Sequence, residues 1–392
     1  MLRLMGLYPQ KEMVAAILLI GSASGFSADL GKKQSWTDKS GKVIEAEFVR
    51  LDEGAVVIEK DGKQFTVPFS KLDDTSLKQA RSLAKPMPEL NPASIPELEA
   101  TPSPAPAATT DGEMASIPGG TFTMGDTFDS KGQSNYQSKP HEVTISGFRL
   151  AKYETTREEW ERVHKWAISH GYSDLAAGAG IESKHPVYQI SWFDAVKWCN
   201  ARSEMEGLSP CYHIDSNHSA PFRTGIVPLT PDHVSWDSNG YRLPTEAEWE
   251  FAARGGLKGK RFPTGDTISH EIANFKNRPG VPYQSGTLSY HPVYKTGTEP
   301  YTAPVGSFAP NAYGLHDMAG NLSEYCWDFF AVYQEEPQVN PRGPQLMGSR
   351  VIRGGSWISD PDYCTVWIRT NIGPTNSRET FLGFRTARKT SP

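Results

Sequence analysis

The chain has 392 residues, 38% of them hydrophobic and 22% charged, with a net charge of −5. This length exceeds what one hydrophobic core usually organises, so we expect more than one module. The acidic balance, without a long run of Lys or Arg, argues against nucleic acid as a partner. The 35 Gly and 30 Pro residues predict a backbone rich in turns and loops.

The first 28 residues have the features of an export signal. Arg3 and Lys11 supply positive charge, the apolar run 13–21 follows, and Ala28 stands at a suitable cleavage position. The apolar run is far shorter than the roughly 20 residues that span a bilayer. We therefore expect an exported protein, periplasmic or extracellular, with no transmembrane segment after cleavage. A membrane-tethered N-terminus is the alternative.

Residues 29–85 contain short alternating apolar stretches separated by turns such as Lys60-Asp-Gly62, which predicts a small antiparallel β-barrel. The order of Trp36-Thr37, Ala46-Glu-Phe48 and Val67-Pro68 resembles the Sla-homology (SHD) domain, an SH3-like module. The resemblance implies a binding or tethering role. Residues 86–112 hold seven prolines and are expected to form an extended linker.

The region 113–392 contains three helix-start signals in which a hydroxyl residue is followed, three positions later, by an acidic one. The pairs are Thr156 with Glu159, Ser191 with Asp194, and Thr245 with Glu248. This is the spacing of a capping box. Gly255-Gly256 is expected to end the third helix.

Four motifs follow one another in this region. They are Tyr241-Arg-Leu-Pro-Thr-Glu-Ala-Glu-Trp-Glu250, Ala312-Tyr-Gly-Leu-His-Asp-Met-Ala-Gly-Asn-Leu-Ser-Glu-Tyr325, Val351-Ile-Arg-Gly-Gly-Ser-Trp357 and Leu382-Gly-Phe-Arg385. In this order they resemble the formylglycine-generating (sulfatase-modifying) enzyme family. The resemblance implies an α+β fold of the C-type-lectin-like, loop-rich kind, stapled by metal ions and disulfides.

The resemblance also implies where catalysis would occur. Active family members hold Cu(I) between two cysteines that follow the Gly-Gly-Ser, and the metal activates O2 to convert a sulfatase cysteine to formylglycine. Here Ser359 occupies the first of these positions and Cys364 the second; Ser356 of the Gly-Gly-Ser is a further candidate catalytic residue. Because a hydroxyl is a hard, weak ligand for Cu(I), we do not expect copper to bind.

Calcium is the cofactor that the resemblance favours, since the family's calcium sites use oxygen ligands, some of them from the backbone. By position, the first ligand set is Asp317, Gly320, Leu322 and Glu324, and the second is Asn274, Phe275, Glu299 and Tyr301.

The cysteines of an exported protein are expected to form disulfides. Cys199 and Cys211 flank one short loop, and we expect them to pair. Cys326 and Cys364 form the second expected pair, with a lone reactive thiol at Cys364 as the alternative.

We therefore predict a non-oxidase accessory or binding scaffold whose partner is a protein or a cell-surface or carbohydrate ligand, with a sulfatase as one candidate. One alternative is a formylglycine-generating oxidase that acts on a sulfatase cysteine. The other is a calcium-dependent, lectin-like module that binds carbohydrate or a surface.

Overall fold

The computed structural model describes residues 33–39, 42–52, 55–60, 63–68, 71–73, 75–76, 79, 113–128, 139–286, 289–345, 348–373 and 375–390. The predicted export signal and linker lie outside these residues. The chain divides into two compact units, Met1–Ala100 and Thr101–Pro392, which we call the N-terminal and C-terminal units. Within the described residues, none of the helices has the length and apolar character needed to cross a bilayer.

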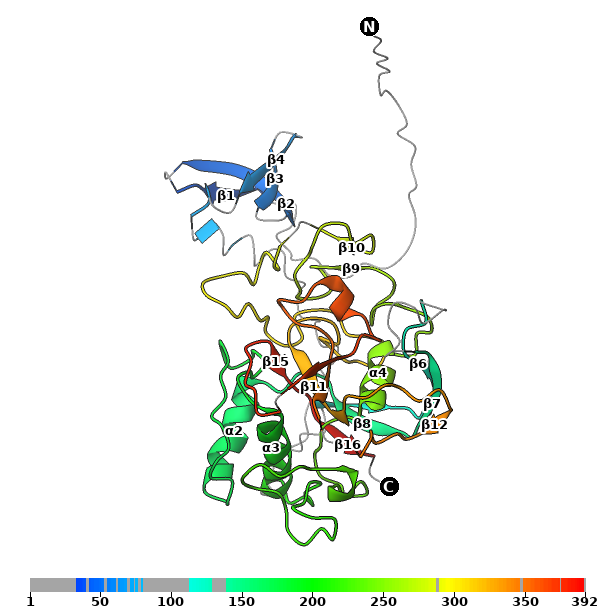
Figure 1. The fold of residues 1–392 in the computed structure, drawn as a ribbon. Coiled ribbons are helices and arrows are strands. Elements are labelled where there is room, and N and C mark those ends of the chain that lie inside the picture. Colours follow the sequence, from blue (N-terminus) through cyan, green and yellow to red (C-terminus); the bar gives the residue numbers. More distant parts are fainter. Residues whose placement is uncertain are drawn as a thin grey trace, which may run out of the picture. The chain divides into compact units, whose positions relative to one another are not determined.

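The N-terminal unit contains an antiparallel meander. Its strands are β1 (Lys33–Thr37), β2 (Val43–Asp52), β3 (Ala55–Lys60) and β4 (Lys63–Pro68), paired in sequence order (Figure 1). Trp36, Val56 and Ile58 form its core, and the Trp36 indole donates a hydrogen bond to the Ala46 carbonyl at 3.0 Å. The predicted antiparallel strands are present, and the SHD assignment stays a prediction.

The C-terminal unit combines small sheets with the helices α2 (Arg157–Ile168), α3 (Trp192–Met205) and α4 (Glu246–Arg254). One sheet has the order β16 (Ala387–Lys389), β8 (Phe148–Ala151), β5 (Met114–Ile117). A second has the order β12 (Gln338–Val339), β7 (His141–Ile145), β6 (Gly120–Met124). A third has the order β14 (Thr370–Ile372), β13 (Arg350–Arg353), β11 (Ser323–Phe329), β15 (Leu382–Gly383), and β9 (Ile268–Ser269) pairs with β10 (Gln284–Ser285). The α+β class predicted from the sequence is confirmed.

The helix starts agree with the capping signals. Reciprocal capping boxes form at Ser191 on α3 and at Thr245 on α4, and Gly255 ends α4 with a left-handed φ of 54°. Thr156 accepts the backbone N–H of Glu159 at 3.2 Å, but the Glu159 side chain pairs with Arg202 on α3 instead of completing the box. A long-range ion pair therefore replaces half of the predicted local motif.

The tryptophans of the helices are scaffold residues. Helices α2 and α3 lie side by side (Figure 1). The rings of Trp160 and Trp198 stack with their centres 5.7 Å apart, and both residues are 0% exposed. Helix α4 packs against β6, β7, β11 and β13 around a separate cluster that contains Trp249. The third sheet runs between these two cores and carries the motif residues discussed next.

Asn321 joins four segments of the C-terminal unit. Its backbone N–H donates to the Asn274 carbonyl at 2.7 Å, and its own carbonyl accepts the N–H of Trp357 at 2.8 Å. Its side chain accepts the N–H of Ala303 at 2.8 Å and donates to the Glu154 carboxylate at 2.6 Å. Asn321 is 0% exposed, so these loops are fastened to one another inside the protein.

Candidate functional site

A cleft of about 460 Å³ opens above the turn that follows β13. Gly354 and Gly355 form its floor with φ values of 90° and 68°. A Cβ at Gly354 would lie 3.1 Å from the Trp249 ring, and one at Gly355 would lie 2.8 Å from the Cys364 sulfur. Both the backbone conformation and these close approaches require glycine.

Ser359 lies in this cleft and closes the turn over Ser356. The Ser359 Oγ accepts the backbone N–H of Ser356 at 2.9 Å, and the two hydroxyl oxygens are 3.1 Å apart. The backbone N–H of Ser359 donates to the Ser356 carbonyl at 2.9 Å. The predicted site residues Ser356 and Ser359 are thus brought together, and the serine side chain has a structural role in holding the turn.

Cys364 lies behind the cleft floor rather than in the cleft. It ends the 3-10 helix η5 (Pro361–Cys364), is 0% exposed, and its thiol is 3.7 Å from the Asp360 carbonyl. Burial raises the pKa of the Cys364 thiol, and the nearby carboxylates of Asp360 and Asp362 raise it further. The thiol is therefore protonated at neutral pH, which makes it a poor nucleophile.

A buried ion-pair network supports the floor from below. Arg353, the last residue of β13, pairs with Glu250 on α4, and its Nε lies 3.5 Å from Glu246. Glu246 also pairs with Arg369, and Glu250 with Arg254 at 2.7 Å. These pairs connect the Thr-Glu-Ala-Glu-Trp-Glu motif directly to the Gly-Gly-Ser turn.

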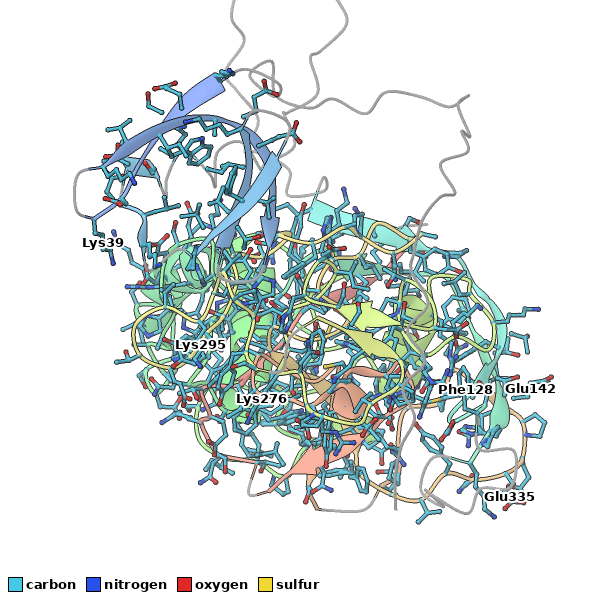
Figure 2. All side chains as sticks on the ribbon, turned by 90° about the horizontal axis from the view of Figure 1, so that it is seen from above. Lys39, Phe128, Glu142, Lys276, Lys295 and Glu335 are labelled. Atoms are coloured by element: carbon cyan, nitrogen blue, oxygen red, sulfur yellow. The ribbon has the colours of Figure 1, made fainter. Side chains whose placement is uncertain are left out.

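The lining of the cleft includes the charged residues Lys276 and Asp360, and Lys276 lies beside an aromatic cluster. Lys276 lines the cleft, and its backbone N–H donates to the Ser359 carbonyl at 3.0 Å. The ammonium groups of Lys276 and Lys295 lie 5.1 Å and 5.2 Å from the centre of the Tyr290 ring. Both lysines are labelled in Figure 2. Tyr290 in turn lies 5.8 Å from Trp357. The cleft thus presents charged groups beside apolar side chains such as Ile358 and Phe381.

In the first predicted calcium set, Asp317 has one carboxylate oxygen without a hydrogen-bond partner among the described residues. One of its carboxylate oxygens accepts the Gly306 N–H at 2.8 Å, and the other is buried without a hydrogen-bond partner in the described structure. Burial raises the pKa of Asp317 to about 6. Glu324 is different, because Arg385 and the Trp249 indole already bond its carboxylate at 2.6–2.9 Å.

In the second set, the structure brings Asn274 and Tyr301 together and leaves Glu299 exposed. The Asn274 side-chain nitrogen donates to the Tyr301 carbonyl at 2.8 Å, while its Oδ1 is buried without a partner among the described residues. The Phe275 carbonyl accepts a hydrogen bond from His270 at 3.0 Å.

The remaining members of the first set contribute backbone groups. The Gly320 N–H donates to the Gly354 carbonyl at 2.8 Å, and the Leu322 N–H donates to Glu154 at 2.8 Å. In the part of the chain that the structure describes, no three His, Cys, Asp or Glu side chains gather as a metal site. A calcium ion at the first set would depend on backbone carbonyl oxygens as well as on Asp317. The unpartnered oxygen of Asp317 in the first set, and that of Asn274 in the second, are of the types that Ca²⁺ takes as ligands.

The two expected disulfides are not formed in the structure: all four cysteines are free and buried. Cys326 packs in the cluster around Trp249, whereas Cys364 packs in a different cluster with Phe275. In the loop after α3, the Asn200 Oδ1 accepts the N–H of Cys211 at 3.1 Å, so a hydrogen bond and not a disulfide joins this loop to the helix. Burial keeps the pKa of both thiols of this pair raised, that of Cys211 to about 11.

Sequence reasoning missed Glu154, a carboxylate that is 1% exposed and bonded to Asn321 and to the Leu322 N–H. Burial raises its pKa well above the usual range, and the carboxylates of Asp317 and Glu324 add to this. A single Glu before Thr155-Thr156 has no local signature of such burial.

Residues 99–390 match the family model described as the sulfatase-modifying factor enzyme 1-like domain. The chain is 33% identical over 314 residues to the formylglycine-generating enzyme of Mus musculus, which covers 73% of this chain and 77% of that protein. It is 31% identical over 258 residues to the chaperone protein LppX of Paenibacillus barcinonensis, covering 64% of this chain and 80% of that protein. Among solved structures, Treponema denticola variable protein 1 superposes with a TM-score of 0.54 at 29% identity, over 71% of this chain and 95% of that one. The predicted C-type-lectin-like fold is confirmed.

Proposed function

Because this chain belongs to the sulfatase-modifying factor family, we propose that it works as an exported binding or accessory protein and not as a copper oxidase. Ser359 is the observation that carries the proposal. A site for Cu(I) in this family fold would need two sulfur ligands, whereas here one position is the Ser359 hydroxyl and the other is the Cys364 thiol, which is buried behind the cleft floor.

The local geometry supports this proposal. Ser359 Oγ is engaged with both the N–H and the hydroxyl of Ser356, so it stabilises the turn that the family motif forms. Cys364 is covered by Gly355 and has a raised pKa, which disfavours the thiolate. The other groups that line the cleft are suited to binding: backbone groups, hydroxyls, the Asp360 carboxylate, and Lys276, whose ammonium lies beside an aromatic ring.

The partner that we propose is an extended segment of another protein, with an unfolded sulfatase as the first candidate. The open cleft between Lys276, Ser356 and Phe381 is of a size that suits a few residues of extended chain. The likeness to a relative named a chaperone protein supports an accessory role. The proposal includes a structural calcium ion near Asp317 and an SHD-type N-terminal module that tethers the protein or binds a partner.

A peptide assay tests the proposal. Reduced, Cu(I)-loaded protein is mixed in air with a Cys-x-Pro-x-Arg peptide; binding is followed by fluorescence anisotropy and aldehyde formation by mass spectrometry. We expect binding without aldehyde, and weaker binding in Lys276→Gln. Aldehyde that disappears in Cys364→Ala would overturn the accessory role.

The second candidate is a formylglycine-generating oxidase. The intact Gly354-Gly355-Ser356 turn, the presence of Cys364 and the 33% identity to formylglycine-generating enzymes favour it. It requires that a single thiol suffice for the chemistry. The same assay separates the two, since only the oxidase produces aldehyde.

A further inference from the structure

The loop between α3 and α4 carries a motif that the proposed function does not use. It is Asp215-Ser-Asn-His-Ser219, in which a serine follows Asn217 by two positions. Asn-x-Ser or Asn-x-Thr, with x other than Pro, is the acceptor sequence for N-linked glycosylation. The sequence contains such a triplet in one other place, Asn321-Leu-Ser323.

The two asparagines differ in their access to solvent. Asn217 is exposed, and its side-chain amide has no hydrogen-bond partner among the described residues. Asn321 is 0% exposed, and its side-chain amide bonds Ala303 and Glu154 in the interior. A transferase must reach the amide nitrogen of the acceptor, so Asn217 is the candidate in the folded protein and Asn321 is not.

Local hydrogen bonds place Asn217 midway along a tight turn. The Asp215 carboxylate accepts the backbone N–H of Asn217 at 3.0 Å and that of Ser219 at 3.1 Å, and it also bonds the Ser219 hydroxyl. The Ile214 N–H donates to the Ala220 carbonyl at 3.0 Å and closes the turn. The carboxylate and the hydroxyl of the motif are therefore held on either side of the exposed asparagine.

His218 connects this turn to the neighbouring chain. Its φ is 54°, its ring lies 4.5 Å from that of His213, and its Nε2 is 3.1 Å from the Asp232 carbonyl oxygen. His218 is itself exposed, so these contacts are made at the surface. Because such a loop opens at low cost compared with the core, the motif can adapt to a transferase while the fold stays intact.

We propose that Asn217 is an acceptor for N-linked glycosylation. The transferase class that fits is the one that requires an acidic residue two positions before the asparagine as well as a hydroxyl two positions after it. Asp215 supplies the carboxylate and Ser219 the hydroxyl, whereas Asn321 has Ala319 in the first of these places. The inference requires export, which the proposed function includes, but neither an accessory role nor an oxidase activity.

The donor in this reaction is an oligosaccharide linked to a lipid diphosphate. The Asn217 side-chain nitrogen forms a bond to the anomeric carbon of the first sugar, and the bond from that carbon to the diphosphate oxygen breaks. The lipid diphosphate leaves, and the amide loses one proton. Nothing is oxidised or reduced, so the transfer needs no further reactant.

Transfer in vitro tests the proposal on the purified, folded full chain, with a single-subunit bacterial oligosaccharyltransferase and its lipid-linked donor. Tryptic digestion after the reaction releases the peptide 203–223, and mass spectrometry measures its occupancy. We expect one oligosaccharide on Asn217 and none on Asn321. We expect loss of modification in Asn217→Gln, Asp215→Ala and Ser219→Ala. Ser219→Thr is the matched control and should keep the modification, because threonine retains the hydroxyl.

A second reaction starts from the tryptic digest of the same chain, alongside an established acceptor peptide. The proposal is overturned if Asn217 is modified in the digest but not in the folded chain, because the fold then shields it. It is also overturned if only the acceptor peptide is modified, or if Asp215→Ala is modified as well as the wild type. None of these results depends on copper or on binding at the cleft, so they leave the test of the proposed function separate.

Discussion

The carboxylate of Glu250 on α4 is bonded to the guanidinium of Arg353, the residue that immediately precedes the Gly354-Gly355 floor of the cleft. Both side chains are 0% exposed, and 103 residues separate them in sequence. Glu250 ends one family motif and Arg353 lies within another. The position of the cleft floor is thus set by an ion pair that crosses the core.

We expect Glu250→Gln to lower the free energy of unfolding by about 3–5 kcal/mol, because it leaves Arg353 and Arg254 with an uncompensated buried charge. Urea unfolding measures the change. The matched control is Glu161→Gln, which breaks the exposed pair with Arg157 and is expected to cost less than about 1 kcal/mol. Equal effects of the two substitutions would contradict the structural role of the buried pair.

Ser359→Cys is expected to create a 1:1 Cu(I) site that the wild-type protein lacks, because it restores the second sulfur ligand beside Cys364. Competition against a colorimetric Cu(I) chelator measures it. Ser359→Ala loses the same hydrogen bond to the Ser356 N–H, with a stability loss of about 1 kcal/mol, and gains no copper. If Ser359→Cys with Cys364→Ala binds copper equally well, Cys364 is not a ligand.

Asp328 should make stability fall as pH rises. Burial raises the pKa of Asp328 to about 7 in the folded protein, and the Glu246 carboxylate adds to this. The unfolded chain has an Asp pKa near 4, so between about pH 4 and pH 7 the folded state binds a proton that the unfolded state has lost. This contribution to stability is fully present below about pH 4 and is lost progressively as pH rises from 4 through 7. We expect Asp328→Asn, which can still accept the Glu246 N–H, to match the wild type near pH 4. At pH 8 the free energy of unfolding of Asp328→Asn should exceed that of the wild type by up to about 4 kcal/mol. Parallel stability profiles from pH 4 to 8 would rule out this titration.

Calcium is expected to raise the unfolding temperature of the wild-type protein by several degrees, since a ligand of the folded state stabilises it by mass action. Asp317→Asn removes the carboxylate with the unpartnered oxygen and is expected to abolish the response. The control is Asp237→Asn, an exposed residue paired with Lys389, in which the response should persist. Differential scanning calorimetry with calcium and with a chelator measures all three. A wild-type protein that does not respond has no calcium site at Asp317.

Local signals in the sequence were sufficient for the helix starts at Ser191 and Thr245 and for the glycine that ends α4. The resemblance also pointed to the contiguous Gly-Gly-Ser motif, whose residues line the cleft in the structure. What local signals could not supply is pairing across the core. The Glu159 carboxylate pairs with Arg202, 43 residues away, and does not cap the start of its own helix.

At the candidate site, too, the sequence indicated the local motif but not the contacts between distant segments. The resemblance named Ser356 and Ser359 as candidate site residues, and the structure adds that their hydroxyl oxygens are 3.1 Å apart. Nothing in the sequence indicated that Cys364 lies beneath Gly355, or that Glu154 reaches Leu322 across 168 residues of chain. These relationships depend on how the loops stack, which no periodicity or spacing encodes. For the same reason a disulfide between Cys326 and Cys364 was expected, although the two residues pack in different clusters.

The hydrogen bonds of Asn321 have a consequence for the folding kinetics of the C-terminal unit. Its side chain bonds Glu154, 167 residues earlier, as well as Ala303, 18 residues earlier, so the loops acquire their shape only after distant parts of the chain have met. Contacts of such sequence separation slow folding, since the entropy of closing long loops is lost before the contacts form. The unit should therefore refold slowly, with α2 and α3 protected from hydrogen exchange before the loops around Asn321.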